Sequence, residues 1–147
     1  MITGMHHFSF TVSDLDKAVN FFCDTLGLKA SPAWEMDGEP IQTIVGMPGT
    51  SLKLCNVLTP DNNVIELIEY VAPKGQEIDL STCNTGVAHL AFKVDNIEKT
   101  YEDLQKKGVK IEHGPVRPSS DPASTERVLG YIKGPDDITI EFIGPLH

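Results

Sequence analysis

Basic residues are scarce in this chain. Only 12 of its 147 residues are Lys or Arg, against 21 Asp or Glu, which gives a formal net charge of −9. Nucleic-acid binding draws on clustered Lys and Arg, so the charge balance argues against a nucleic-acid partner. The sequence also lacks long runs of like charge, which argues against a charged interaction tail.

Long apolar runs and paired cysteines are missing as well. The amino terminus, MITGMHHFSF, has no basic segment followed by an apolar stretch, so we expect no secretory signal. No apolar run approaches the roughly 18 residues that a membrane span needs, so we expect no membrane partner. The three cysteines, Cys23, Cys55 and Cys83, form no CxxC pair. An odd number of widely spaced cysteines indicates reduced thiols, so we expect a cytoplasmic protein.

What the chain does contain is an internal repeat. The segments that begin at His7 (HFSFTV) and at His89 (HLAFKV) run in step, and each leads into a helical pattern that a glycine ends. A short apolar strand with one glutamate follows each helix, with Glu66 in VIELIEY and Glu141 in ITIEFI. Self-similarity on this scale indicates a duplicated unit. With 40% hydrophobic residues, the chain can bury a sizeable interior around the two copies.

Each copy is predicted to be a βαβββ module. Helices are expected to begin at the caps Ser13 and Asp95 and to end at Gly27 and Gly108. After the first helix we predict strands at 40–46, 51–58 and 63–70, and after the second at 109–113, 127–133 and 137–143. The Pro- and Ser-rich segment 114–126 is predicted to be a loop. The sequence therefore predicts an α+β fold of two tandem modules, 1–71 and 87–147, joined by a linker, 72–86.

Strand parity places the histidines and the glutamates on one face. Phe8 and Phe10 point toward the helix, so His7 points the other way, and by the repeat so does His89. Glu69 is three residues from Glu66 and therefore faces the opposite side of its strand. A carboxylate inside an apolar strand is costly unless a cation or hydrogen-bond donors compensate it. A curved mixed sheet would aim both carboxylates and both imidazoles at a common cleft.

Two imidazoles and two carboxylates suit a first-row divalent ion. Taken alone, His7 would more often be a polar surface residue, and His89 a hydrogen-bonded core residue. Their arrangement across the duplication instead predicts one metal site. Its ligands are His7, Glu66, His89 and Glu141. Nickel, cobalt, zinc, manganese and iron all remain open as the metal.

These motifs resemble the vicinal oxygen chelate superfamily, which includes glyoxalase I, methylmalonyl-CoA epimerase, extradiol dioxygenases and fosfomycin- and bleomycin-resistance proteins. The resemblance rests on four segments, which are HFSFTVSD at 7–14, VIEL at 64–67, HLAFKVD at 89–95 and GPDDITIEF at 134–142. It implies a small-molecule substrate with metal-chelating oxygens. It also implies a homodimer, with a cleft formed within one chain or between two.

The metal ligands are most similar to those of glyoxalase I, whose bacterial members use a His–Glu–His–Glu set. That resemblance implies a lyase or isomerase in which Glu141 acts as the general base, with Glu66 as its counterpart. Thr11 and Tyr70 stand where bacterial glyoxalases carry an arginine and an asparagine that help to hold glutathione. The resemblance therefore implies the proton transfer but not glutathione as the carrier.

Other members of the superfamily leave alternatives. An iron-dependent extradiol dioxygenase would use His7, His89 and Glu141, together with a tyrosine at the place of Tyr131. It would leave Glu66 without a role, and its second catalytic histidine is missing. An epimerase would need a further acidic residue in the stretch 49–53, and this chain has none there. A fosfomycin transferase would share Tyr131, but the sequence shows no group of basic residues to bind a phosphonate. A non-catalytic drug-binding protein of the bleomycin type generally lacks metal ligands.

Overall fold

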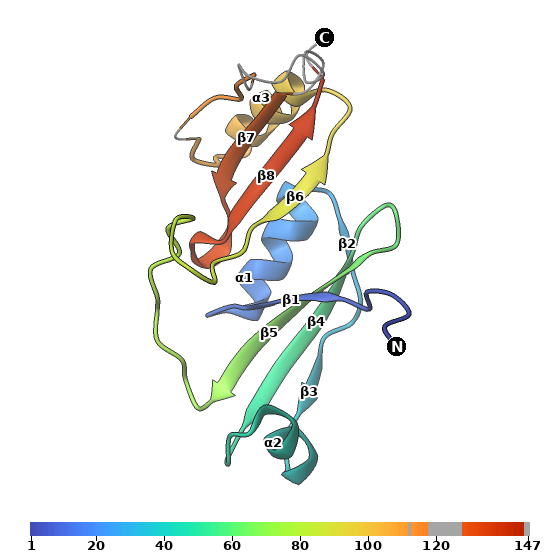
Figure 1. The fold of residues 1–147 in the computed structure, drawn as a ribbon, viewed down its shortest axis with the longest axis vertical. Helices are drawn as coiled ribbons and strands as arrows, with labels where there is room; N and C mark the ends of the chain where they lie inside the picture. Colours follow the sequence, from blue (N-terminus) through green and yellow to red (C-terminus); the bar gives the residue numbers. More distant parts are fainter. Residues whose placement is uncertain (112, 118–127, 146–147) are drawn as a thin grey trace. The chain divides into compact units, whose positions relative to one another are not determined.

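The chain forms two compact units in a computed structural model that describes residues 1–111, 113–117 and 128–145. The first unit is Met1–Glu77 and the second is Ile78–His147. Each holds one mixed β-sheet with helices (Figure 1). The α+β class predicted from the sequence is confirmed. The bounds of the two predicted modules and of their linker stay a prediction.

The first unit is built on a five-stranded sheet. The strands pair in the order β1-β5-β4-β2, and β3 also pairs with β4. Strand β1 runs parallel to β5, and the other pairs are antiparallel. The bounds are β1 (Phe8–Thr11), β2 (Lys29–Ala30), β3 (Trp34–Met36), β4 (Ser51–Leu58) and β5 (Val64–Ala72).

Helix α1 (Leu15–Asn20) packs against β4 and β5, and the π-helical turn η1 (Phe21–Thr25) that continues it contacts β2. Leu15, Ala18 and Phe22 of this helical segment are buried, as are alternate residues of β5 such as Leu67. The helix cap is Asp14, whose carboxylate accepts a hydrogen bond from the Lys17 amide at 3.0 Å. The predicted cap, Ser13, lies one residue too early.

The predicted strand at 40–46 is wrong, because helix α2 (Glu39–Val45) occupies that stretch. Pro40 fits the first turn of a helix, where its missing amide hydrogen costs nothing. Gly46 ends the helix in the left-handed region, at a φ of 69°. Ile41 forms a buried cluster with Leu52 and Leu54 of β4, and Val45, four residues further along the helix, packs against that cluster. In place of this strand, the sheet has the short strands β2 and β3, which come before α2 in the chain.

The second unit carries a three-stranded sheet in the order β6-β8-β7. Helix α3 packs against β8 and buries Ile97, Tyr101 and Leu104. Its cap is Asn96, whose side chain accepts from the Lys99 amide at 2.8 Å, one residue after the predicted Asp95. The bounds are β6 (Leu90–Lys93), α3 (Ile97–Lys106), β7 (Val128–Lys133), the 3-10 turn η3 (Pro135–Asp137) and β8 (Thr139–Gly144).

The predicted strand at 109–113 is not found in the part of it that the structure describes. Nearby, Val116 instead forms a single bridge to Leu129 of β7. Most of the loop predicted at 114–126 lies outside the described residues. No helix in the described ranges combines the length and hydrophobicity that crossing a membrane requires.

The internal repeat extends to the pairing register. In the first unit Ser9 of β1 lies opposite Glu66 of β5, and in the second Ala91 of β6 lies opposite Glu141 of β8. Both strand pairs, β1 with β5 and β6 with β8, are parallel. Strands β1 and β6 each begin one residue after a histidine. The two caps that follow also agree, with φ and ψ of −148° and 109° at Asp14 and −146° and 108° at Asn96.

Candidate metal centre

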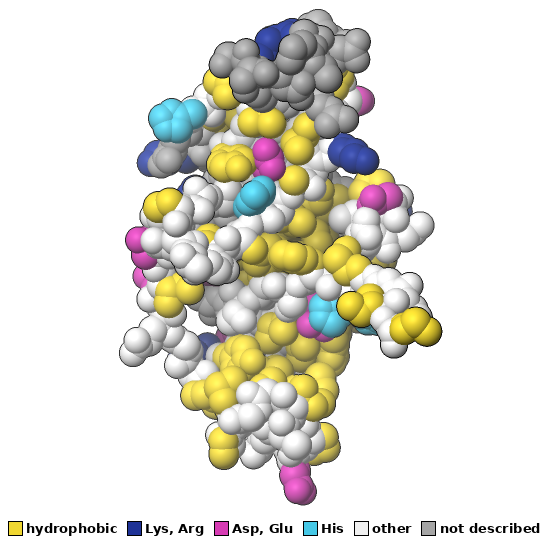
Figure 2. All heavy atoms as spheres, in the orientation of Figure 1, with side chains coloured by type: hydrophobic (Ala, Val, Ile, Leu, Met, Phe, Trp, Pro, Cys, Tyr) yellow, Lys and Arg dark blue, Asp and Glu magenta, His cyan; other side chains and the backbone are white. Residues whose placement is uncertain are grey.

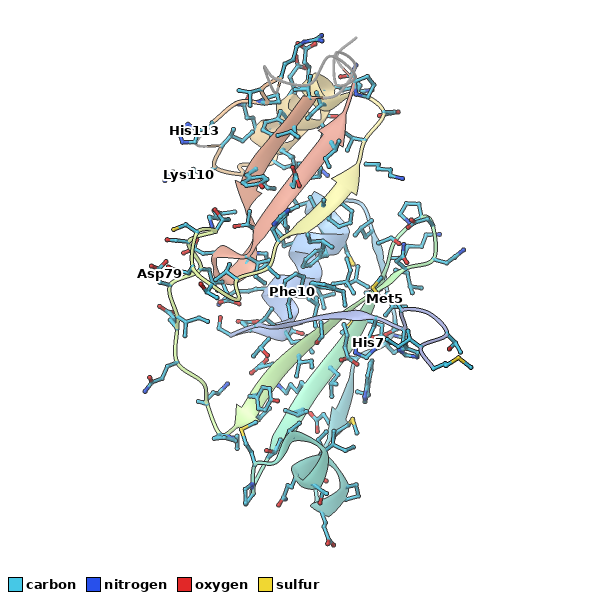
Figure 3. The ribbon with its side chains drawn as sticks, in the orientation of Figure 1. Met5, His7, Phe10, Asp79, Lys110 and His113 are labelled. Atoms are coloured by element: carbon cyan, nitrogen blue, oxygen red, sulfur yellow. The ribbon has the colours of Figure 1, made fainter. Side chains whose placement is uncertain are left out.

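The first unit brings His7 and Glu66 together, and we call them the first pair. His7 precedes β1 by one residue and shares the strand face of Ser9, which lies opposite Glu66. The His7 Nε2 lies 3.5 Å from the Glu66 Oε2. The side chains are 38% and 18% exposed, so both are reachable from solvent. His7 is labelled in Figure 3, beside the start of β1.

The second unit repeats this arrangement with His89 and Glu141, the second pair. The His89 Nε2 lies 3.2 Å from the Glu141 Oε2. Their side chains are 42% and 10% exposed, so Glu141 is the more deeply buried of the two carboxylates. Its strand neighbours Ile140 and Phe142 are buried on the side of α3. A carboxylate in this setting needs a cation or hydrogen-bond donors beside it.

Both distances suit two ligands of one metal ion. Bonds of about 2.1 Å from nitrogen and oxygen, at tetrahedral or right angles, put the two donor atoms about 3.0–3.4 Å apart. The separations of 3.5 and 3.2 Å are close to that range. An imidazole nitrogen and a carboxylate oxygen are also donors that first-row divalent ions accept. Each pair therefore fits half of a metal site.

His6 contacts His7 of the first pair and is not one of the site residues predicted from the sequence. Its Nδ1 lies 2.8 Å from the Nδ1 of His7, with the two rings nearly perpendicular at 83°. A contact at Nδ1 leaves Nε2 of His7 directed at Glu66. Hydrogen bonds to the second ring nitrogen commonly fix the orientation of metal-binding histidines. One indication of this contact was present in the sequence, where His6 and His7 are adjacent.

Tyr131 borders the second pair. It lies opposite Glu141 in the β7–β8 register, and its ring centroid is 5.5 Å from that of His89. Tyr131 is 43% exposed. Asn56 takes the same place in the first unit, opposite Glu66. Comparing the residue ten positions before each glutamate would have identified Asn56 from the repeat.

Glu69 has a different role from Glu66. It faces α1, where its carboxylate accepts a hydrogen bond from the Leu15 amide at 3.0 Å and pairs with Lys74 at 3.1 Å. The hydrogen bond from Leu15 and, secondarily, the contact with Lys74 lower the pKa of Glu69. Glu69 therefore supports the start of α1.

Beyond Glu66, the same face of the first sheet is apolar. Ile68 follows on β5 and lies opposite Leu54 of β4, which in turn lies opposite Trp34 of β3. Trp34 and Met36 are partly buried against the cluster under α2. Figure 2 shows hydrophobic side chains gathered over this part of the first unit. The side chains of Trp34 and Met36 therefore fill the core beneath α2.

Neither unit alone gathers three or more His, Cys, Asp or Glu side chains in a metal-binding arrangement, among the residues that the structure describes. Each unit supplies one pair. That all four ligands meet at a single ion stays a prediction.

Comparison with known proteins identifies the family of this chain. Residues 4–142 match the model of the Glyoxalase/Bleomycin resistance protein/Dioxygenase superfamily, and the chain belongs to this superfamily. A probable lactoylglutathione lyase from Synechocystis is 29% identical over 140 residues, covering 93% of this chain and 92% of the relative. A 2-epi-5-epi-valiolone epimerase from Actinomyces is 28% identical, covering 95% of this chain and 78% of the relative.

The fold is shared with a solved structure. A glyoxalase family protein from Bacillus cereus matches with a TM-score of 0.82 at 24% sequence identity, over 100% of this chain and 97% of that chain. At this identity the likeness shows the fold alone.

Proposed function

We propose that this chain is a divalent-metal-dependent lyase or isomerase of glyoxalase type. The observation that carries the proposal is the pair of equivalent His–Glu contacts, at 3.5 and 3.2 Å, in the same register of the two units. Burying a carboxylate in an apolar strand costs free energy, yet both units place one beside an imidazole. A metal ion bound by both units would explain the repetition. The reaction would transfer a proton at a carbon next to a substrate oxygen.

His7, Glu66, His89 and Glu141 would hold one ion of nickel, cobalt, zinc, manganese or iron. A bound divalent ion supplies Lewis acidity, which makes a hydrogen on the neighbouring carbon easier to remove. The first and second pairs lie in different units, so the complete site forms within one chain or between two copies in a homodimer.

Glu141 is proposed as the base that removes this proton, and Glu66 as its counterpart. A carboxylate is a suitable general base when it lies within hydrogen-bond reach of the proton. Burial of Glu141 limits competing hydrogen bonds from water. Tyr131, opposite Glu141, can donate its phenolic hydrogen to a substrate oxygen.

The named relatives support this class of reaction, since one is called a lactoylglutathione lyase and another an epimerase. Glutathione is not part of the proposal, because Thr11 and Tyr70 replace the residues expected to hold it. The three cysteines are free, which is typical of cytoplasmic proteins and supports the proposed location.

A ring-cleaving dioxygenase is the second candidate. The contact of the Tyr131 ring with His89 favours it, since that tyrosine is expected beside the iron ligands of such enzymes. The contact of Glu66 with His7 favours the lyase, because a three-ligand iron site leaves Glu66 unused. A binding protein without turnover is the third candidate, and it explains neither pair.

Turnover assays separate the three candidates. Purified protein is loaded in turn with nickel, cobalt, zinc, manganese or iron(II) and offered the adducts of a 2-oxoaldehyde with several thiols. We expect conversion of an adduct to the 2-hydroxyacyl thioester, with Glu141→Gln slower by at least about 100-fold. Oxygen-dependent consumption of catechols with iron(II) would instead identify the dioxygenase. Absence of turnover with every metal would leave the binding protein.

A further inference from the structure

A groove of about 640 Å³ runs along strand β7 in the second unit. The β7 edge forms one side, from Leu129 to Lys133. The segment Ser81–Cys83 contributes to another side, and residues between Lys110 and Val116 to a third. We call this the β7 groove. Lys110 and His113, which line it, are labelled in Figure 3.

Local structure accounts for the space. Val116 and Leu129 exchange two backbone hydrogen bonds, at 2.9 and 3.1 Å. The described residues just before Val116 form no strand along the rest of β7. On the facing side, Asp79 accepts hydrogen bonds from the Ser81 amide at 2.8 Å and hydroxyl at 2.6 Å. The Asn84 side chain donates to the Asp79 carbonyl at 3.1 Å. These bonds give the groove an ordered wall.

The β7 groove gathers positive charge in an acidic protein. The lysines Lys110 and Lys133 line it together with the imidazole of His113, although the chain as a whole has a net charge of −9 with histidine counted as neutral. The Lys133 ammonium donates to the Thr139 hydroxyl at 2.8 Å and to the Asp137 carbonyl at 3.2 Å. Both of these acceptors are neutral, so they hold the charge in place without cancelling it. The carboxylate of Asp79 also interacts electrostatically with Lys133, and Asp79 lies outside the groove lining.

Apolar groups complete the lining. Val116 and Leu129 contribute aliphatic surface beside the cations. A ligand with an apolar stem and an anionic end would therefore match the groove. Such an anion would form charge-assisted hydrogen bonds, which are among the stronger polar contacts in proteins.

Tyr131 connects this groove to the second pair. Its side chain lines the groove, lies opposite Glu141 and stacks obliquely at 5.5 Å from the His89 ring. We propose that the β7 groove binds the anionic end, a carboxylate or a phosphate, of the substrate whose reacting carbon lies at Glu141. This inference rests on the proposed function for the link to Glu141, while binding in the groove can be tested without metal or turnover.

The test is a binding titration of the full chain, followed by NMR of the backbone amides in metal-free protein. The probes are 3-phenylpropionate and phenyl phosphate, with 3-phenylpropanol as the neutral match. We expect the anions to shift the amides of residues 81–83 and 129–133 and to bind more tightly than the alcohol. Lys133→Gln and Lys110→Gln should each weaken anion binding by about 10-fold, since a charge-assisted hydrogen bond is lost.

Three controls make the result specific. Lys133→Arg retains the charge and should largely restore anion binding. Lys99→Gln removes an exposed charge on α3, away from the groove, and should leave binding at the wild-type level. Preserved dispersion of the amide spectrum verifies that each variant is folded. Stronger binding of one anion than the other identifies carboxylate or phosphate as the preferred group.

Equal binding of 3-phenylpropanol and the anions, or shifts confined to other residues, would overturn the inference. So would Lys→Gln variants that bind the anions as wild type does. Anion binding in the groove together with no turnover on any thiol adduct would count against the proposed function alone. Turnover without charge-dependent binding in the groove would count against this inference alone.

Discussion

Tyr131 lies directly opposite Glu141 in the antiparallel β7–β8 pair. Its ring also contacts that of His89, so a single side chain borders both members of the second pair. The first unit places Asn56 at the same position, opposite Glu66. The two halves are therefore alike in their proposed ligands and unlike in the neighbouring residue. This difference is what makes the Glu141 side chemically distinct.

The role of the Tyr131 hydroxyl can be tested with Tyr131→Phe. The ring and its contact with His89 are retained, and only the phenolic donor is lost. We expect kcat on the best thiol adduct to fall by about 10–100-fold, as removal of a hydrogen bond to reacting groups commonly does. Metal content should stay at the wild-type level. An unchanged kcat would show that the hydroxyl takes no part in the reaction.

Alanine variants of Glu66 and Glu69 compare a proposed metal ligand with a residue that supports the fold. Glu69→Ala removes the acceptor for the Leu15 amide at the start of α1 and should lower the free energy of unfolding by about 1–2 kcal/mol. It should leave metal binding intact. Glu66→Ala should do the opposite, with metal binding lost and little loss of stability in metal-free protein. Urea denaturation and metal analysis of both variants check the assignment, which the reverse pattern would contradict.

The pH dependence of Glu69 follows from the same contacts. The amide of Leu15 and the ammonium of Lys74 hold its pKa below the ordinary value of 4.5. The unfolded chain therefore takes up a proton at a higher pH than the folded chain. The stability that Glu69 contributes is present above pH 4.5 and is lost as the pH falls through its folded pKa. In Glu69→Ala, the acid-induced loss of stability should be smaller.

Tyr101 should make the second unit sensitive to alkali. Its hydroxyl is buried and, among the described residues, has no hydrogen-bond partner. Burial, with a smaller effect of Glu141, raises the pKa of Tyr101 from 10.0 to about 12. Above pH 10 the unfolded chain loses this proton while the folded chain keeps it, so unfolding becomes more favourable. Two pKa units correspond to about 2–3 kcal/mol of stability lost by pH 12.

The variant Tyr101→Phe isolates this effect. It keeps the packing of the ring against Phe142 and removes the unpaired hydroxyl. We expect Tyr101→Phe to be at least as stable as wild type at pH 7, because a buried hydroxyl without a partner is destabilising. The two proteins should then diverge further between pH 10 and 12 in denaturant titrations. Parallel pH profiles would show that the hydroxyl is solvated or paired in solution.

Much of the fold follows from the repeat in the sequence. The opening strands, the glycine at the end of each helix and the two glutamate-bearing strands all leave local patterns in side-chain polarity. The helix caps were each predicted one residue too early, at Ser13 and Asp95. Both are capping residue types followed by another one, Asp14 or Asn96, so composition alone does not choose between them. The backbone stays extended through the second residue of each pair.

Helix α2 shows where local patterns mislead. The stretch IQTIV is short and β-branched, which favours a strand. Pro40 and Gly46 favour a helix of that length, and burial of Ile41 against Leu52 and Leu54 stabilises it. That burial depends on residues of β4, so a reading of the stretch by itself cannot include it. Strands β2 and β3 are only two and three residues long and leave too short a pattern to identify.

For the site, strand parity was sufficient to separate Glu66 from Glu69 and to predict that each histidine shares a sheet face with a glutamate. The contact of each histidine with the glutamate of its own unit depends on the parallel pairing of β1 with β5 and of β6 with β8, which parity does not give. His6 and Asn56 were missed because neither belongs to the ligand pattern, although the repeat marks the position of Asn56. The β7 groove could not be foreseen. It depends on the path of Ser81–Cys83 and of the residues before Val116, which have no regular pattern.

Metal binding by the four single-alanine variants of His7, Glu66, His89 and Glu141 tests the central claim most directly. Each protein is stripped with a chelator and titrated with nickel or cobalt by calorimetry, with Glu69→Ala as the control. One ion should bind per wild-type chain, and each of the four variants should weaken that binding by at least about 100-fold. The control should bind as wild type does. Wild-type affinity in variants of either pair would contradict a single centre shared by the two units.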